Sequence, residues 1–181
     1  MNFAAIVRDY TSRHRESARR EVRYYMIQPS LEDAIREATL SRLPIGKRHP
    51  HQRRIPLRVL QAAERRLQAI AAQLQTATSF AELHRLIDRQ IKPIRGIGDL
   101  AVYDIAHRIG AYLRREPEAV YLHAGTREGA RALSLAGKKI EVRELPAGLR
   151  KLSAAEIEDC LCIYKDALHG RVLRIGTRAL C

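Results

Sequence analysis

The residues best suited to chemistry lie in one short segment, Lys92-Pro93-Ile94-Arg95-Gly96-Ile97-Gly98. Two glycines flank an apolar residue, and the basic side chains of Lys92 and Arg95 stand beside them. A helix that begins directly after Gly98 has unpaired N–H groups and a partial positive charge at its first turn. Glycine adds no side chain that would keep an anion away from these groups. The segment therefore predicts a phosphate-binding turn, with Ile97 packed inward to fix its shape.

The elements on either side of this turn are predicted to be helices. Ser79 followed by Glu82 is the pattern of a capping box, so a helix should begin directly after Ser79. Apolar residues then recur at helical spacing, and Pro93 ends this helix because it lacks a hydrogen-bond donor. Asp99 is expected to cap the second helix, whose apolar face continues to Leu113.

Together, residues 80–113 resemble the helix-hairpin-helix DNA-binding motif, in which a Gly-apolar-Gly hairpin joins two apolar helices. The hairpin residues here are Gly96, Ile97 and Gly98, and Ala101 follows them. The resemblance implies that the glycines let the backbone approach a DNA phosphate, and that amides of the second helix donate to its oxygens. The residues alone also allow a plain turn whose glycines only close a tight corner. A Rossmann phosphate loop is disfavoured because it follows a strand, whereas a helix is expected first here.

The charge and composition of the chain limit the class of partner. The 181 residues carry a formal net charge of +13, and nucleic acid is the leading partner for such a charge. An Arg- and Ala-rich composition produced by a GC-rich genome is the competing explanation. Aromatic residues make up 5% of the chain, with no Trp, which argues against binding of single strands by base stacking. We therefore expect duplex or structured DNA, contacted through its phosphate backbone.

A second basic segment lies upstream, in a loop at residues 43–54. Its basic residues, which no acid in the loop balances, are Lys47, Arg48, Arg53 and Arg54. These side chains are predicted to make a second phosphate contact, although a solvated basic loop would have the same composition. His49 and His51 lie in this loop, but no Cys or acid is near them in the sequence. We therefore expect no metal site and no cofactor.

A third set of polar residues lies at the start of a later helix, which Thr126 is expected to cap. Tyr121, His123 and Arg127 are a candidate anion or substrate pocket, because an imidazole and a guanidinium lie close to the first-turn amides. The competing interpretation is an ordinary helix start, with these side chains serving packing and solubility.

The chain places a connection and then a further helix after the helix-hairpin-helix. This order is distantly similar to that of the endonuclease III type DNA glycosylases. The resemblance implies a catalytic aspartate at the head of the later helix, but residues 120–131 contain no Asp. Bifunctional members carry a lysine just after the second glycine, where this chain has Asp99 and Leu100. Three scattered cysteines cannot ligate the iron–sulfur cluster of some members. We therefore assign no catalytic residue.

The complete pattern predicts an all-α, single-domain helical bundle over residues 1–181, with the helix-hairpin-helix at about 80–113. Residues 138–143 alternate charged and apolar side chains like a short strand, but have no evident partner. Residues 170–181 are expected to form a loose C-terminal tail. The chain has no signal-peptide pattern, no membrane-length apolar run and no disulfide framework, so a cytoplasmic protein without a membrane partner is expected.

These observations predict a sequence-independent DNA-binding protein that grips backbone phosphates, and a binding protein rather than an enzyme. Two alternatives stay open. The first is a DNA repair enzyme of the glycosylase or lyase type with an atypical site near His123, which would need a carboxylate directed at the hairpin. The second is a helix-hairpin-helix module that binds protein, which predicts binding insensitive to salt.

Overall fold

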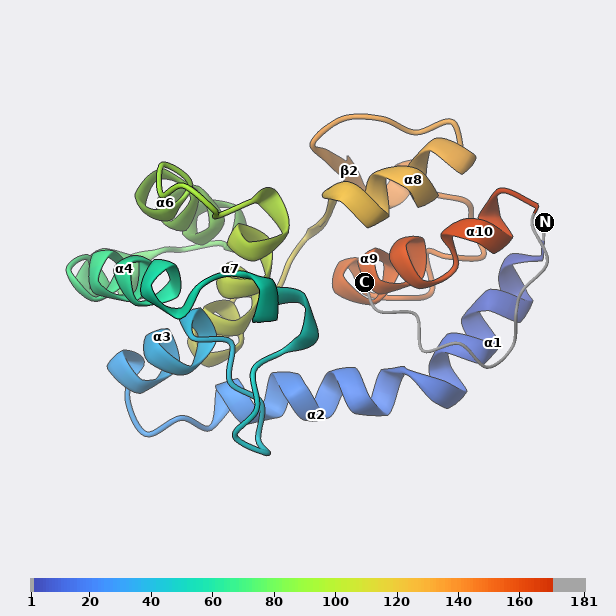
Figure 1. Ribbon diagram of the computed structural model, residues 1–181. Helices are drawn as coiled ribbons and strands as arrows, with labels where there is room; N and C mark the ends of the chain where they lie inside the picture. Colours follow the sequence, from blue (N-terminus) through green and yellow to red (C-terminus); the bar gives the residue numbers. More distant parts are fainter. Residues whose placement is uncertain (1, 171–181) are drawn as a thin grey trace. The chain divides into compact units, whose positions relative to one another are not determined.

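The computed structural model describes residues 2–170 and shows a mostly helical chain (Figure 1). This part of the chain contains ten α-helices, two 3₁₀-helices and one pair of short strands. The expected all-α class is therefore confirmed in its coarse form, because the described residues are mostly helical and also contain a small two-stranded sheet. Of the predicted C-terminal tail at residues 170–181, all but Gly170 lies outside the described residues.

The chain divides into two compact units. The central unit consists of residues 18–116, and the terminal unit joins the N-terminal segment up to Ser17 with the chain from Pro117 onward. The expectation of one domain over 1–181 stays a prediction, because two compact units can belong to one cooperative domain or fold separately. Each unit is described by itself below.

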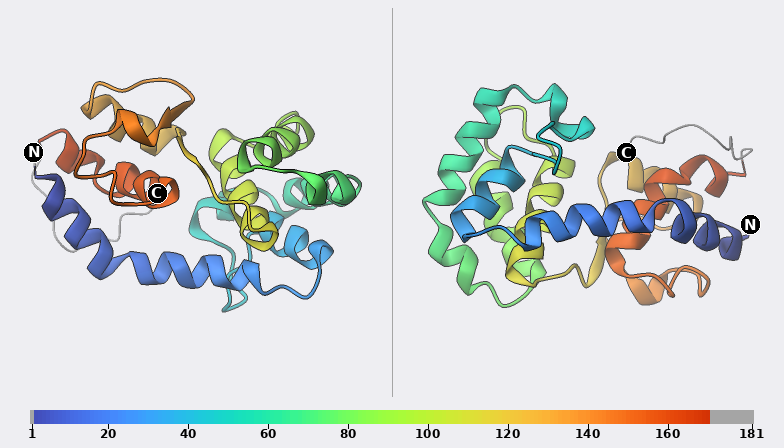
Figure 2. Two further views of the ribbon diagram at one scale, coloured as in Figure 1. Left: turned by 180° about the vertical axis from the view of Figure 1, so that it is seen from behind. Right: turned by 90° about the horizontal axis from the view of Figure 1, so that it is seen from below.

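The central unit is built around α7 (Asp99–Leu113), which is buried along most of its length. Its other elements are α2 (Arg15–Met26, which starts just before the unit), α3 (Leu31–Thr39), η1 (Pro50–Arg54), α4 (Leu57–Gln68), α5 (Ala71–Thr76) and α6 (Phe80–Ile91). Helix α7 packs against α3 and α6, and α4 lies beside α6, as both figures show (Figures 1 and 2). Gly110 permits the close α6–α7 packing, since a Cβ there would lie 3.3 Å from the Phe80 side chain of α6. It also lets the chain fold back after α7, since the same Cβ would lie 2.5 Å from the Arg115 carbonyl.

The predicted start of α6 is confirmed. The Ser79 side chain accepts a hydrogen bond from the Glu82 amide at 3.2 Å, and the Glu82 carboxylate accepts one from the Thr78 amide at 2.8 Å. The first bond satisfies a donor that the helix start leaves open, whereas the second holds the residue before the N-cap in place of the Ser79 amide that a capping box would engage. They fix the beginning of the helix that leads to the predicted turn.

The terminal unit is built around α9 (Ala154–Ile163), which packs against α1, α8, α10 and β1. Its other elements are α1 (Phe3–Arg13), β1 (Ala119–Tyr121), α8 (Ala124–Ala132), β2 (Lys139–Glu141), η2 (Val142–Glu144) and α10 (Lys165–Leu168). Strands β1 and β2 are antiparallel, with Val120 opposite Ile140. The strand predicted near residues 138–143 thus pairs with β1, which lies in a segment that the sequence indicated as a connection.

Glycine and tyrosine residues set the packing around α9. A Cβ at Gly129 would lie 2.0 Å from the Leu161 carbonyl, so α8 and α9 approach backbone to backbone. The Tyr10 hydroxyl of α1 donates to Asp159 at 2.6 Å, and the Tyr164 hydroxyl donates to Asp9 at 2.8 Å.

None of the described helices is both long enough and apolar enough to cross a membrane.

Candidate nucleic-acid interface

The predicted turn joins α6 to α7 over residues 92–98. The Ile94 amide donates to the Ile91 carbonyl at 3.0 Å, and the Ile97 amide donates to the Ile94 carbonyl at 3.0 Å. Gly96 has a φ of +102°, in the region that favours glycine. Ile97 is 6% exposed and lies inward, as the sequence predicts. The turn is therefore closed by its own backbone and anchored by one apolar side chain.

The start of α7 differs from the prediction, because Gly98 is the N-cap and Asp99 is the first helical residue. Gly98 is extended, with φ −99° and ψ 175°, and its carbonyl already accepts the Val102 amide at 3.1 Å. No side chain caps this helix start. Gly98 is exposed, and apart from its own atoms and its chain neighbours no heavy atom lies within 4 Å of the position that its Cβ would take. The first turn of α7 therefore starts from an N-cap without a side chain, so no cap side chain stands between its amides and an anion.

The charges at the turn partly cancel. The Lys92 ammonium forms an ion pair with the Asp99 carboxylate, and both side chains are about half exposed. Arg95 is exposed and forms no ion pair within the described chain. The turn thus carries two positive charges and one negative charge, so its local field favours an anion.

Helix α4 lies against this turn. A Cβ at Gly96 would meet the Val59 side chain of α4 at 3.7 Å. Farther along α4, the Arg66 guanidinium donates to the Gln90 carbonyl in the last turn of α6 at 3.0 Å. The exposed Arg58 directly precedes Val59 in the first turn of α4, so it lies next in sequence to the residue that meets the turn. No motif in the sequence had marked Arg58 as part of the site.

The predicted basic loop is hydrogen-bonded rather than open. Within it, the Gly46 amide donates to the Leu43 carbonyl and the Leu43 amide to the Lys47 carbonyl, both at 2.8 Å. Gly46, with φ +73°, makes the tight turn. The His49 amide closes the loop onto the Ser41 carbonyl, also at 2.8 Å. Lys47 lies exposed at the tip of an ordered hairpin.

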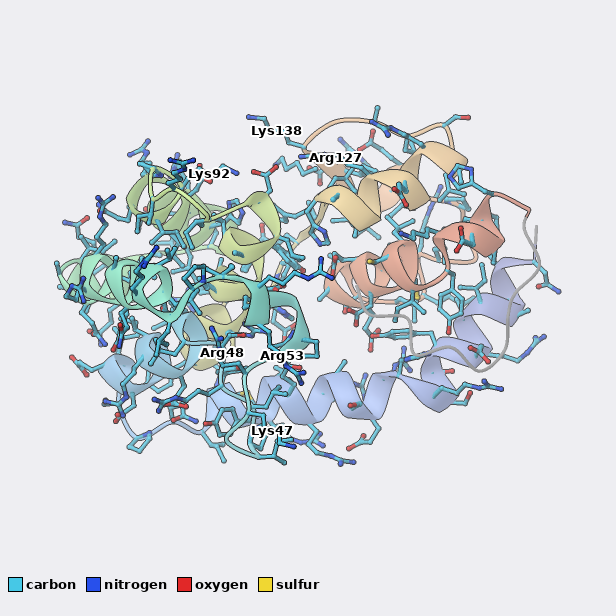
Figure 3. The ribbon with its side chains drawn as sticks, in the orientation of Figure 1. Lys47, Arg48, Arg53, Lys92, Arg127 and Lys138 are labelled. Carbon is cyan, nitrogen blue, oxygen red and sulfur yellow. The ribbon has the colours of Figure 1, made fainter. Side chains whose placement is uncertain are left out.

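Two of the four predicted phosphate contacts in the loop also hold its backbone. Arg48 donates to the carbonyls of Ile55 at 2.9 Å and Arg53 at 3.3 Å, and Arg53 donates to the Arg48 carbonyl at 3.3 Å. Arg54 is exposed, as is Lys47. Figure 3 shows Lys92 well apart from Lys47, so the structure does not bring the loop tip and the α6–α7 turn together.

A buried polar network fastens this loop to α7. Gln52 is 1% exposed, and its amide nitrogen donates to the Asp104 carboxylate. The Gln52 oxygen accepts from the Ser41 hydroxyl at 2.6 Å and from the Arg108 guanidinium at 3.4 Å. Arg108 also donates to the Ser41 hydroxyl at 3.0 Å. Both ends of the loop are therefore fixed to the same helix, an attachment that no local sequence pattern predicts.

Arg108 keeps its charge inside this network. Its Nη2 donates to the Glu21 carboxylate at 3.2 Å, and its guanidinium carbon lies 5.4 Å from the centre of the Tyr25 ring. Burial alone would lower the pKa of Arg108, but Tyr25, Asp104 and Glu21 raise that pKa overall. The buried cation is thus compensated by a carboxylate and a ring face.

The third predicted set of residues has a different environment from the turn. His123 is 3% exposed, and its Nε2 pairs with the Glu158 carboxylate of α9. His123 is the N-cap of α8, and Thr126, which was expected to cap, instead lies inside and accepts the His123 amide at 2.7 Å. The Nε2 of His123 is therefore engaged by a carboxylate of the protein itself.

The other two members of this set, Tyr121 and Arg127, are half-buried. Burial, followed by the charges of Glu118 and Glu141, raises the pKa of Tyr121.

Among the described residues, no three His, Cys, Asp or Glu side chains gather in a group that could hold a metal ion. No protein-family model, curated protein or solved structure matches this chain.

Proposed function

We propose that this protein binds duplex DNA through its backbone phosphates, with the α6–α7 turn as the principal contact. The observation that carries the proposal is the start of α7, where a glycine N-cap leaves the first-turn amides without a capping side chain and with open space around Gly98. Amides and helix dipole both favour an anion at such a position. Lys92 and Arg95 add full charges beside it.

The charge distribution supports this choice of partner. Residues 18–116, which contain the turn, carry 19 Lys and Arg residues against 10 Asp and Glu residues. Between Glu37 and Glu64 the chain has six basic residues and no acid. Lys47 and Arg54 of the ordered loop supply a second phosphate contact. Contacts of this kind position a protein on DNA without reading bases.

The aromatic residues support duplex over single-stranded DNA. All Phe and Tyr residues of the chain lie in the described part, and each is buried or half-buried. Proteins that hold single strands stack successive bases on exposed rings. Without such a platform, phosphate contacts to a duplex account best for the basic surface.

The test is equilibrium binding of labelled duplex DNA over a salt series, comparing the wild type with Gly98→Glu and Gly98→Gln. Gly98 has an ordinary extended backbone and open space, so both side chains fit without strain. The two replacements have nearly the same size and differ in charge. We expect Gly98→Glu to weaken binding about tenfold or more, and Gly98→Gln to retain affinity within about threefold of the wild type.

Circular dichroism controls for folding of both variants. Steep salt dependence in the wild type, together with a loss confined to the glutamate variant, would support the proposal. Wild-type affinity in a folded Gly98→Glu variant would overturn it, as would absence of duplex binding by the wild type at low salt.

A further inference from the structure

Beside the α6–α7 turn, helices α4 and α6 expose a set of arginines that no sequence motif marks. They come from two helices that are adjacent in space but separated in sequence by α5. The exposed arginines of the two helices are Arg58, Arg65, Arg66, Arg85 and Arg89. We call this surface the α4–α6 basic face.

Helical geometry places these arginines on the outer side of each helix. Arg58 and Arg65 are seven residues apart, so they share a side of α4, opposite to the buried Leu60 and Leu67. Arg85 and Arg89 are four residues apart on α6 and lie opposite to its buried residues in the same way. Each helix therefore presents one basic stripe to solvent.

The two stripes and the turn are continuous. Arg66 bridges the helices by donating to the Gln90 carbonyl at 3.0 Å. Val59 of α4 lies against Gly96 of the turn. Figure 1 shows α4 and α6 side by side, and the two helices are in contact. An anion bound at the turn would therefore meet this face directly.

Acids do not balance the face. Arg58, Arg65 and Arg89 form no ion pair within the described residues, whereas Arg36 and Arg13 elsewhere pair with neighbouring aspartates. Glu64 of α4 and Asp88 of α6 each directly precede a stripe residue, so they point about 100° away around the helix.

Glu82 and Asp88 each lie three residues from Arg85 on α6, at the spacing of helix neighbours. The Glu82 carboxylate is engaged by the Thr78 amide at 2.8 Å and hydroxyl at 2.9 Å, and these bonds, followed by the charge of Arg85, lower its pKa. Arg85 is thus partly balanced. The free charge of the face comes from the arginines nearest the turn.

We propose that the α4–α6 basic face is a second backbone-binding surface, which holds the phosphates that continue along the duplex from the turn. This inference rests on the function proposed above. Arg85 and Arg89 are about 6 Å apart along α6, and Arg58 and Arg65 about 10 Å apart along α4. Phosphates of one strand advance by about 3.4 Å each, so the face spans several of them. A lipid surface fits less well, because Leu57 is the one large apolar residue exposed on the described parts of these helices.

The test removes one charge from each helix, in the variant Arg58→Ala/Arg89→Ala. The matched control is Arg131→Ala/Arg143→Ala, which removes two exposed arginines without ion-pair partners from the described terminal unit. Affinity for labelled duplex of mixed sequence is measured over a salt series. We expect the α4–α6 variant to lose about tenfold in affinity and to lower the salt slope by about two, since each phosphate contact contributes about 0.9. The control should stay within about twofold of the wild type.

Equal losses in the two variants would overturn the inference, because total charge would then account for both. Unchanged binding by Arg58→Ala/Arg89→Ala would also overturn it. If that variant binds normally while Gly98→Glu does not, the second surface fails and the turn stands. If the wild type binds no duplex, the proposed function fails first. Binding of the wild type to anionic phospholipid vesicles that is lost in the α4–α6 variant, with duplex binding unchanged, would assign the face to a membrane surface and overturn the inference.

Discussion

At the scale of single residues, Asp99 is the least expected feature of the proposed site. A carboxylate in the first turn stabilises a helix through its dipole, but it also repels a phosphate at the same amides. The ion pair with Lys92 offsets that repulsion, but it also engages one of the two cations of the turn. The proposed site is therefore weaker than its amides and cations alone would make it.

This balance predicts that Asp99→Asn binds duplex DNA more tightly than the wild type. The change removes one negative charge and releases Lys92 for the phosphate, so we expect a gain of about threefold to tenfold at low salt. Anisotropy titration measures the gain. Glu32→Gln is the control, because it removes an exposed acid from the first turn of α3. Equal or weaker binding by Asp99→Asn would contradict a phosphate at this helix start.

At the scale of elements, the basic loop depends on α7 for its order. Ser41 and Gln52 stand at its two ends, and both bond to Arg108. The loop contributes little apolar packing of its own, since the Ile45 side chain at its tip is 73% exposed. Its shape is therefore held by buried polar contacts rather than by a core of its own.

We predict that Arg108→Met lowers the free energy of unfolding by about 3 kcal/mol or more. The substitution keeps an extended apolar stem but leaves Glu21, Ser41 and Gln52 without their shared donor. Urea denaturation measures the effect, with Arg20→Met on the exposed side of α2 as the control. A second change, Glu21→Leu, should recover part of the loss, because it removes the carboxylate left behind. A loss below about 1 kcal/mol for Arg108→Met would show that the network does not hold the loop.

Most of the elements at the proposed site follow from local sequence signals. Ser79 caps α6, and glycines make the turn. These patterns act within a few residues, so the sequence displays them directly. The alternation at residues 138–143 indicates β2, but its partner strand does not follow in this way. Val120, which lies opposite Ile140, belongs to a strand of three residues, which is too short for a periodic pattern.

The partners of the candidate residues were less predictable, because they come from distant parts of the chain. Glu158 pairs with His123 across 35 positions, and Gln52 reaches Asp104 across 52. Neither pair has a local signal in one sequence. Only Arg108 offered a clue to such a partner, because it is a charged residue directly beside the apolar face of a predicted helix. Exposed arginines such as Arg58 carry no such clue, because their role depends on which helix packs beside them.

At the scale of the whole molecule, the two compact units divide the chain and its charge unequally. The terminal unit is discontinuous in sequence, since Ile6 and Tyr10 of α1 share a hydrophobic core with residues 120–168. Composition and hydrophobic periodicity cannot show that α1 joins this core, because neither of them reports which distant segments pack together. The central unit carries the larger excess of basic residues and contains every residue of the proposed DNA contact.

The most direct measurement of phosphate binding at the start of α7 is the response of backbone amides to duplex DNA in ¹H–¹⁵N NMR spectra of the full chain. We expect the amides of Gly98, Asp99, Leu100 and Ala101 to shift most and to saturate with the added duplex. Added salt should reverse these shifts. Shifts confined to other parts of the chain, with those four amides unmoved at saturation, would contradict a phosphate at the start of α7.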